Sequence, residues 1–307
     1  AVWLCIRCCV ALSKLELCLA IGSLLSMANL DAARFRAAQT AFSATRYGES
    51  EYWTARYAAD GGLEAYDWYL RWEQLKEHLM PLLVPAADPE DRSCEILVVG
   101  CGSSTLSEAL YTEGFSSITN IDKCSQLIEA MKARHQQQID GPPAGAKGKK
   151  PEKAKAPSPD PVPGRPPMTF LEADVRDLPQ DWTGKFDLVL DKALLDSVTC
   201  GPDKWQNVET AMRSVRRVLK PSSGCYVCVS HAGPEVRKKM ILGPYQENAT
   251  VSADYGWNFT HVTTPRPLIN PNIDPKSKEK FELVKSPNYD PSMDVYNIYI
   301  CKLGEHS

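Results

Sequence analysis

A short apolar strand that leads directly into a glycine loop and then a helix is the feature that most limits how this chain can fold. Residues 95–99 (EILVV) are mainly apolar and β-branched, Gly100 and Gly102 follow at once, and residues 104–111 have the pattern of a helix. Such a unit is typical of an α/β protein in which a ligand approaches the backbone between strand and helix. We therefore expect a parallel sheet.

The rest of the chain continues this alternation. Helices are expected at 125–137, 205–219 and 235–240, and strands at 117–121, 168–171, 186–190 and 225–230. Strands that alternate with helices form a mostly parallel sheet covered on both faces. Residues 281–284 and 295–301 are strand-like with no long helix between them, which predicts an antiparallel pair at the sheet edge. Residues 255–259 are assigned only as an aromatic segment.

Three segments are expected along the chain: 1–30, 31–90 and 91–303. Residues 1–30 lack an uncharged stretch of the roughly 20 residues that span a membrane, so no membrane association is expected. They are either an import presequence or an extension outside the fold, with Met27 as the true start. Residues 31–90 are helical to about residue 78 and rich in aromatics. Residues 139–167 hold nine prolines and should form a surface insertion within the third segment.

Charge and cysteine content narrow the classes of function. A net charge of −3 gives no general attraction to nucleic acid, so a protein or small-molecule substrate is favoured. Most of the 11 cysteines lie beside apolar strands, and we expect reduced, buried thiols. Cys225 and Cys228 are spaced like metal ligands, but residues three apart on a strand face opposite ways, so we expect no metal.

Acidic residues follow the expected strands. Asp122 lies twenty residues beyond Gly102, where a carboxylate can accept both ribose hydroxyls, and Asp174-Val175 could recognise an adenine. Thr105 and Leu106 stand in place of the third glycine of a dinucleotide fingerprint. These features favour S-adenosylmethionine over NAD, although the acids could instead cap helices.

The runs ILVVGCGSSTLSEALY, NIDKCSQLIEAMKARH and LVLDKALLDSV resemble the family of eukaryotic lysine methyltransferases of translation elongation factor 1 alpha, the endothelin-converting-enzyme-2-linked branch among them. The runs EYWTARY and YDWYLRW strengthen the match, which covers about 51–230. The resemblance implies a Rossmann-like, seven-stranded, mostly parallel sheet with an antiparallel edge strand. It also implies a class I methyltransferase that uses S-adenosylmethionine. Related members methylate other proteins, including mitochondrial citrate synthase, so the acceptor stays open.

The same resemblance assigns the cofactor contacts. They would come from the loop and strand ends, and from aromatic residues of a segment that covers the pocket: Trp53, Tyr57, Tyr66, Gly100, Asp122, Lys123, Asp174, Val175 and Lys192. Trp53 and Tyr57 lie four residues apart on one helix face, so core packing is the alternative for both.

The acceptor side is less well defined. Family members usually have Gly-Thr after the lysine, whereas this chain has Ala193-Leu194, which leaves the acceptor pocket in doubt. Asp191 and Asp196 are candidate catalytic groups that orient the acceptor amine, although Asp196 equally suits a helix cap. Tyr255 and Trp257 would either line the acceptor channel or pack in the core, and core packing is the favoured interpretation for both. His231 is either at the pocket edge or a surface histidine.

The expected function is therefore protein-lysine methylation, with elongation factor 1 alpha or another abundant protein as partner. Methylation of a small molecule and a non-catalytic cofactor-binding module are the alternatives. We expect a monomer located in the cytoplasm, or in mitochondria if residues 1–26 are a presequence.

Overall fold

The structure is a computed structural model that describes residues 46–59, 65–140, 165–201, 203–243, 255–266 and 295–304. The chain divides into two units, Ala1–Tyr47 and Gly48–Ser307, and the description below concerns the second. The expected N-terminal extension, most of the insertion and the strand expected at 281–284 lie outside the described residues.

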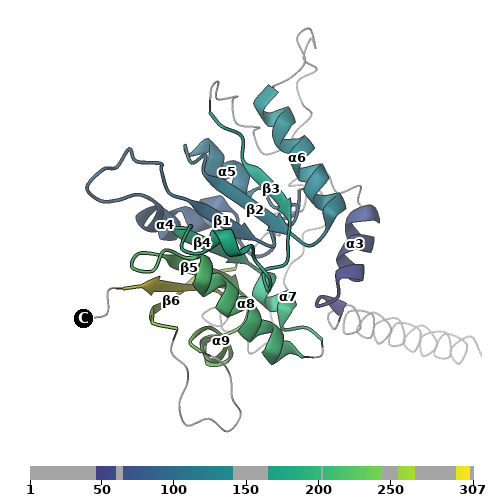
Figure 1. Ribbon diagram of the computed structural model, residues 1–307, viewed down its shortest axis with the longest axis vertical. Helices are drawn as coiled ribbons and strands as arrows, with labels where there is room; N and C mark the ends of the chain where they lie inside the picture. The colour runs from purple at the N-terminus through teal and green to yellow at the C-terminus, as the bar shows by residue number, and fades with distance from the viewer. Residues whose placement is uncertain are drawn as a thin grey trace, which may run out of the picture. The chain divides into compact units, whose positions relative to one another are not determined.

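A seven-stranded sheet in the order β3-β2-β1-β4-β5-β7-β6 forms the centre of this unit (Figure 1). Its strands are β1 (Ile96–Val99), β2 (Ile118–Asp122), β3 (Thr169–Glu172), β4 (Leu188–Lys192), β5 (Cys225–Ser230), β6 (Trp257–Pro265) and β7 (Val295–Leu303). The pairs among β1 to β5 are parallel, and β7 runs antiparallel to both β5 and β6. The α/β fold and mostly parallel sheet are confirmed, and the reversed strand lies next to the edge strand.

Helices cover both faces of the sheet (Figure 1). The helices are α3 (Ser50–Ala59), α4 (Trp72–Leu83), α5 (Leu106–Thr112), α6 (Ser125–Asp140), α7 (Leu194–Val198), α8 (Lys204–Val218) and α9 (Pro234–Ile241), with a 3₁₀ turn at Gln180–Trp182. Segment 65–71, where the aromatic pattern suggested one continuous helical region, is not helical. The expectation of helix to about residue 78 is wrong there, and this irregular stretch supplies part of the site.

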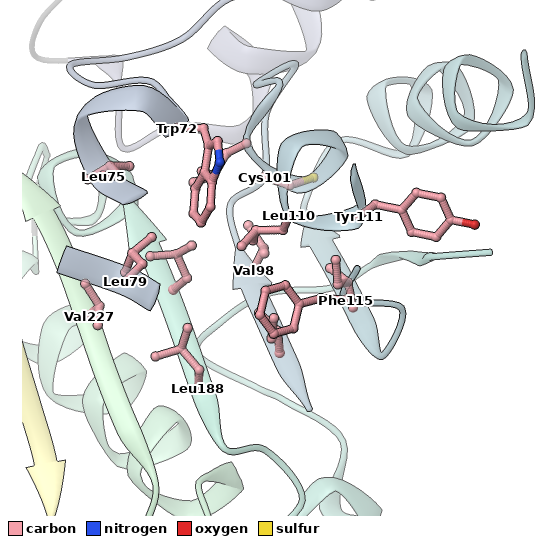
Figure 2. Close-up of a cluster of buried hydrophobic side chains, with 14 of the residues drawn as sticks. Trp72, Leu75, Leu79, Val98, Cys101, Leu110, Tyr111, Phe115, Leu188 and Val227 are labelled. Atoms are coloured by element: carbon pink, nitrogen blue, oxygen red, sulfur yellow. The ribbon is translucent and has the colours of Figure 1, made fainter. Parts of the chain in front are cut away.

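Two hydrophobic clusters lie on opposite faces of the sheet because strand side chains alternate. In the first, Leu75, Leu110 and Met131 of α4, α5 and α6 pack on Val98 and Leu188. Figure 2 shows part of this cluster, with Trp72, Leu79, Phe115 and Val227 among its labelled side chains.

The second cluster packs α7, α8 and α9 on the other face. Leu195, Val208 and Met240 represent the three helices, and Val189 belongs to the sheet. Cys225 belongs to the first cluster and Cys228 to the second, so the two thiols do face opposite ways. Full burial of such apolar side chains contributes about 1.5–3 kcal/mol each.

β6 is the strand that was not predicted from the sequence. Its nine residues, WNFTHVTTP, pair antiparallel with β7 along their whole length, from Trp257↔Leu303 to Pro265↔Val295. Polar residues recur in it because an edge strand keeps part of its surface in solvent. Within the described residues, no helix is long and apolar enough to cross a membrane.

Candidate cofactor and acceptor site

The glycine loop lies where the strand order reverses between β1 and β4, the place where open α/β sheets bind ligands. Gly100 and Gly102 have φ of 61° and 53°, a conformation that favours glycine. A Cβ at Gly100 would come within 2.8 Å of Leu194 Cδ1, and one at Gly102 within 3.1 Å of Tyr57 Oη. Both positions therefore require glycine, because the loop packs closely against Leu194 and Tyr57.

Asp122 lies at the end of β2 and is held against this loop. Its Oδ2 accepts the Gly102 N–H at 3.2 Å, and its Oδ1 accepts the Cys124 N–H at 3.1 Å. Burial raises the pKa of this carboxyl, while the backbone N–H groups favour its ionised form. A carboxylate fixed beside the loop suits the two hydroxyls of a ribose.

Asp174 follows β3, next to Asp122. Burial opposes its ionisation, but Arg176 donates from its backbone at 2.9 Å and from its guanidinium at 2.6 Å, and the pKa of Asp174 is lowered. Lys123 Nζ lies 3.4 Å from the same carboxylate. Val175, which the sequence suggested as an adenine neighbour, is only 6% exposed and packs in the second cluster.

The aromatic residues before β1 form one connected cluster. Tyr57 lies near the glycine loop, and burial together with the charge of Asp122 raises its pKa. Trp53 stacks on Tyr57 with ring centroids 5.9 Å apart. The Arg56 guanidinium lies over Trp53 at 5.7 Å and over Tyr66 at 5.1 Å. Tyr57 is therefore the aromatic residue placed directly at the expected cofactor contacts, and Trp53 and Tyr66 surround Arg56.

Lys192, at the end of β4, contacts a partner that the sequence did not suggest. Its Nζ donates to Asp67 Oδ1 at 3.1 Å and to the Trp68 carbonyl at 3.0 Å. Burial lowers the pKa of Lys192, and Asp67 opposes that effect. Asp67 also accepts hydrogen bonds from Ser104 and Thr105, just beyond the glycine loop. Asp67 therefore connects segment 65–71 to the residues after the glycine loop and to the end of β4. Its only signal in the sequence was its place in the run YDWYLRW.

Asp191 is buried and acts as a helix cap. Its Oδ1 accepts the Leu194 N–H at 2.9 Å, and its Oδ2 accepts the Leu195 N–H at 3.1 Å and the Tyr226 hydroxyl at 2.9 Å. Burial raises the pKa of Asp191 to about 7. A catalytic role for Asp191 stays a prediction, and the observed hydrogen bonds give it a structural role at the start of α7.

Asp196 is also buried, but its partners lie at the end of β5 and in α9. It accepts hydrogen bonds from Ser230 at 2.9 Å and from Arg237 at 2.7 Å, and His231 Nδ1 lies 2.8 Å from its Oδ1. The sequence suggested a cap for Asp196 as an alternative, whereas Asp191 fills that role. Asp196 and His231 are therefore brought together, and Tyr69 joins them.

Ala193 and Leu194 show what the departure from the usual Gly-Thr pair does. Ala193 has φ of 74°, a left-handed conformation that suits glycine better. Leu194 places its side chain against Gly100, so the change puts an isobutyl group at the glycine loop.

Tyr255 and Trp257 lie far from the acceptor side. Trp257 pairs with Leu303, beside Lys302, which pairs with Cys225 at the first residue of β5. These residues therefore lie level with the amino-terminal end of β5, whereas the site residues described above lie at the carboxyl ends of the parallel strands. Trp257 is buried in the second cluster, so the core-packing interpretation is confirmed and the acceptor-channel one is wrong.

These residues can hold a nucleoside beside a glycine loop and place an acceptor near the ends of β4 and β5. The geometry fits S-adenosylmethionine because Asp122 can accept ribose hydroxyls while Gly100 and Gly102 expose backbone.

Comparisons with known proteins give the same result. Residues 97–227 match the model of a methyltransferase domain. EEF1A lysine methyltransferase 4 of Mus musculus is 30% identical over 230 residues, covering 71% of each chain. The eEF1A lysine and N-terminal methyltransferase of Mus musculus is 30% identical over 201 residues, which are 65% of this chain and 24% of that protein.

Among solved structures, the N-methyltransferase NodS from Bradyrhizobium japonicum, in complex with S-adenosyl-L-homocysteine, is 13% identical with a TM-score of 0.42, covering 75% of this chain and 87% of that one. The assignment rests on the sequence relatives. The chain belongs to the family of class I S-adenosylmethionine-dependent methyltransferases that includes EEF1A lysine methyltransferase 4.

Proposed function

We propose that this methyltransferase modifies a lysine side chain of elongation factor 1 alpha or of a similar abundant protein. The observation that carries the proposal is the 30% identity to EEF1A lysine methyltransferase 4, which extends over 71% of both chains. This match is longer than the stretch 97–227 that fits the methyltransferase domain model.

Methyl transfer requires alignment more than activation of the donor. S-adenosylmethionine, when bound, supplies a methyl group on a sulfonium, which is already a good leaving group. The residues of the chain have to position the nucleoside, exclude water and present an amine in line with the methyl group. Asp122 and the glycine loop would hold the nucleoside, and Tyr57 would shield it.

Lys192 would act indirectly. Its bonds to Asp67 and Trp68 fix segment 65–71 across the ends of β1 and β4. We infer that Lys192 shapes the pocket wall through this segment, since its ammonium group already has two partners.

The proposal is tested by incubating the full chain with recombinant elongation factor 1 alpha and radiolabelled S-adenosylmethionine. Label in the factor, mapped to a lysine by mass spectrometry and lost when that lysine is replaced by arginine, supports it. The control is Asp122→Ala, which should fail to bind S-adenosylmethionine in a calorimetric titration. Cofactor binding by the wild type without transfer to the factor or to any protein of a lysate would contradict the proposal. No label in any fraction of the lysate, low-mass fraction included, would favour a non-catalytic module.

A small-molecule acceptor is the second candidate. Leu194 keeps this candidate open, because an apolar side chain lies against Gly100 where the resemblance described above leads us to expect threonine. Label in a low-mass fraction of the lysate, with none in protein, would select this candidate.

We also propose that the protein is a monomer located in the cytoplasm. Light scattering after gel filtration tests the first, and a fluorescent fusion of the full chain tests the second. Mitochondrial fluorescence would instead favour a presequence at residues 1–26.

A further inference from the structure

A group of polar side chains lies where β4 and β5 end, next to the cofactor contacts. His231 follows β5, and its Nδ1 lies 2.8 Å from Asp196 Oδ1 and 2.9 Å from Tyr69 Oη. The His231 side chain is 57% exposed, and among the described residues none bonds its Nε2. The imidazole is therefore fixed on one side and open on the other.

Asp196 can orient this imidazole. Its side chain is only 8% exposed, and Ser230 and Arg237 bind its Oδ1 at 2.9 and 2.7 Å. Its Oδ2 is buried and has no hydrogen-bond partner in the part of the chain that the structure describes. A carboxylate held in this way favours a proton on His231 Nδ1, and the lone pair then stays on Nε2.

Tyr69 contacts the same ring nitrogen, because its Oη lies 2.9 Å from Nδ1 and can accept from the Nδ1–H while its own hydroxyl proton is donated to Asp196. The φ of 65° at Tyr69 is unusual for a bulky residue, and the bond from Lys192 to the Trp68 carbonyl holds the turn before it. Burial raises the pKa of Tyr69, so the hydroxyl keeps its proton. Because Asp67 in the same segment binds Ser104 and Thr105, His231 is tied to the edge of the sheet that carries the glycine loop.

We propose that His231 is a catalytic base that takes a proton from the acceptor ammonium group, with Asp196 and Tyr69 as its positioning residues. This inference rests on the proposed function, in which the acceptor is an amine. His231 Nε2 accepts one proton from R–NH₃⁺ and leaves R–NH₂. The amine lone pair then forms the N–C bond to the methyl group while the C–S bond breaks and leaves its electron pair on sulfur. The proton on Nε2 passes to solvent through the exposed side of the ring.

Titratable and charged groups face His231 from several elements. Asp196 faces it from α7, Tyr69 from segment 65–71, and Arg237, bound to Asp196, from α9. Tyr296 of β7 packs on Tyr69 with ring centroids 4.7 Å apart. Arg237 offsets the charge of Asp196, so the carboxylate beside His231 is not an unbalanced buried charge.

The test compares wild type with His231→Gln in methyl transfer to elongation factor 1 alpha between about pH 6.5 and pH 9.5. A missing general base lowers kcat about 100-fold near pH 7.5, and solvent hydroxide should narrow that gap as the pH rises. The affinity for S-adenosylmethionine, measured by calorimetry, should not change. His78→Gln is the matched control, since its ring bonds Thr264 and touches none of the groups around His231.

Tyr69→Phe separates positioning from folding, because it removes only the hydroxyl that contacts Nδ1. We expect a kcat decrease of about 3- to 10-fold with an unchanged KM. A wild-type pH profile in His231→Gln, or an equal loss at every pH together with weaker cofactor binding, would overturn the proposal.

Nitrogen NMR of the imidazole gives a second measurement that needs no acceptor. The proposal requires the tautomer with the proton on Nδ1 near neutral pH, and a proton on Nε2 would overturn it. If the wild type transfers nothing to elongation factor 1 alpha, the proposed acceptor is wrong, and the NMR result alone decides the role of His231.

Discussion

Asp191 should make the stability of the folded protein depend on pH in a direction opposite to that of most carboxyl groups. Burial raises its pKa from 3.8 to about 7, so between these values the folded state holds a proton that the unfolded state has lost. Stability from this group is therefore fully present below the unfolded pKa and is lost as the pH rises through about 7. At about 1.4 kcal/mol per pH unit, the interval corresponds to about 4 kcal/mol in total.

The perturbation that isolates this effect is Asp191→Asn. An asparagine oxygen can still accept the Leu194 and Leu195 N–H groups, and its amide can donate to the Tyr226 oxygen, so the cap is kept while the titration is removed. Urea unfolding of both proteins at about pH 5.5 and about pH 7.5 should show wild type gaining about 2 kcal/mol relative to the variant at the lower pH.

An unchanged difference at the two pH values would refute the reasoning, since it would mean that Asp191 does not titrate in this range. Asp191→Ala is the control for the cap. It leaves three donors without their acceptor, so we expect a loss of about 3 kcal/mol at about pH 7.5. The loss should be about 2 kcal/mol larger at about pH 5.5, because this variant also lacks the titrating carboxyl group. Methyl transfer by Asp191→Asn also tests the catalytic role expected from the sequence, which requires turnover to fall more than cofactor affinity.

Three further changes test other parts of the structure. Ala193→Gly should raise the free energy of unfolding by about 1 kcal/mol, because glycine adopts the left-handed conformation at lower cost; an unchanged urea midpoint would contradict the observed φ. Gly100→Ala should weaken S-adenosylmethionine binding in calorimetry, since the added Cβ meets Leu194 Cδ1 at 2.8 Å. Gly201→Ala is the control for the effect of a positive φ alone, because its Cβ meets nothing within 4 Å. Burial lowers the pKa of His135, so its contribution to stability is present above the unfolded pKa of 6.5 and is lost at lower pH; His135→Gln should unfold with a weaker dependence on pH below 6.5.

The glycine loop and Asp122 could be predicted because their signals are local. Strand, glycine pair and helix follow one another within residues 95–111, and the next strand end is fixed by the same alternation. The contact between Asp122 and Gly102 then follows from the pairing of β1 with β2.

The acceptor side could not be predicted in the same way. Asp191 is the penultimate residue of β4 and Asp196 lies in α7, and their roles depend on where α7 begins, which is at Leu194. Tyr69 contacts His231 with its own backbone in the left-handed conformation, in a segment whose sequence suggested a helix. Tyr69 and His231 are 162 residues apart in the chain, so no local sequence pattern could indicate their contact.

The bond between Lys192 and Asp67 has a consequence for the order of folding. The two residues are 125 positions apart, so segment 65–71 can dock only after β4 has paired into the sheet. During synthesis the strands from β1 to β4 would have to emerge before the segment gains its anchor. The same segment should then be the first to detach in the folded protein, and its amide hydrogens should exchange faster than those of β1 and β4.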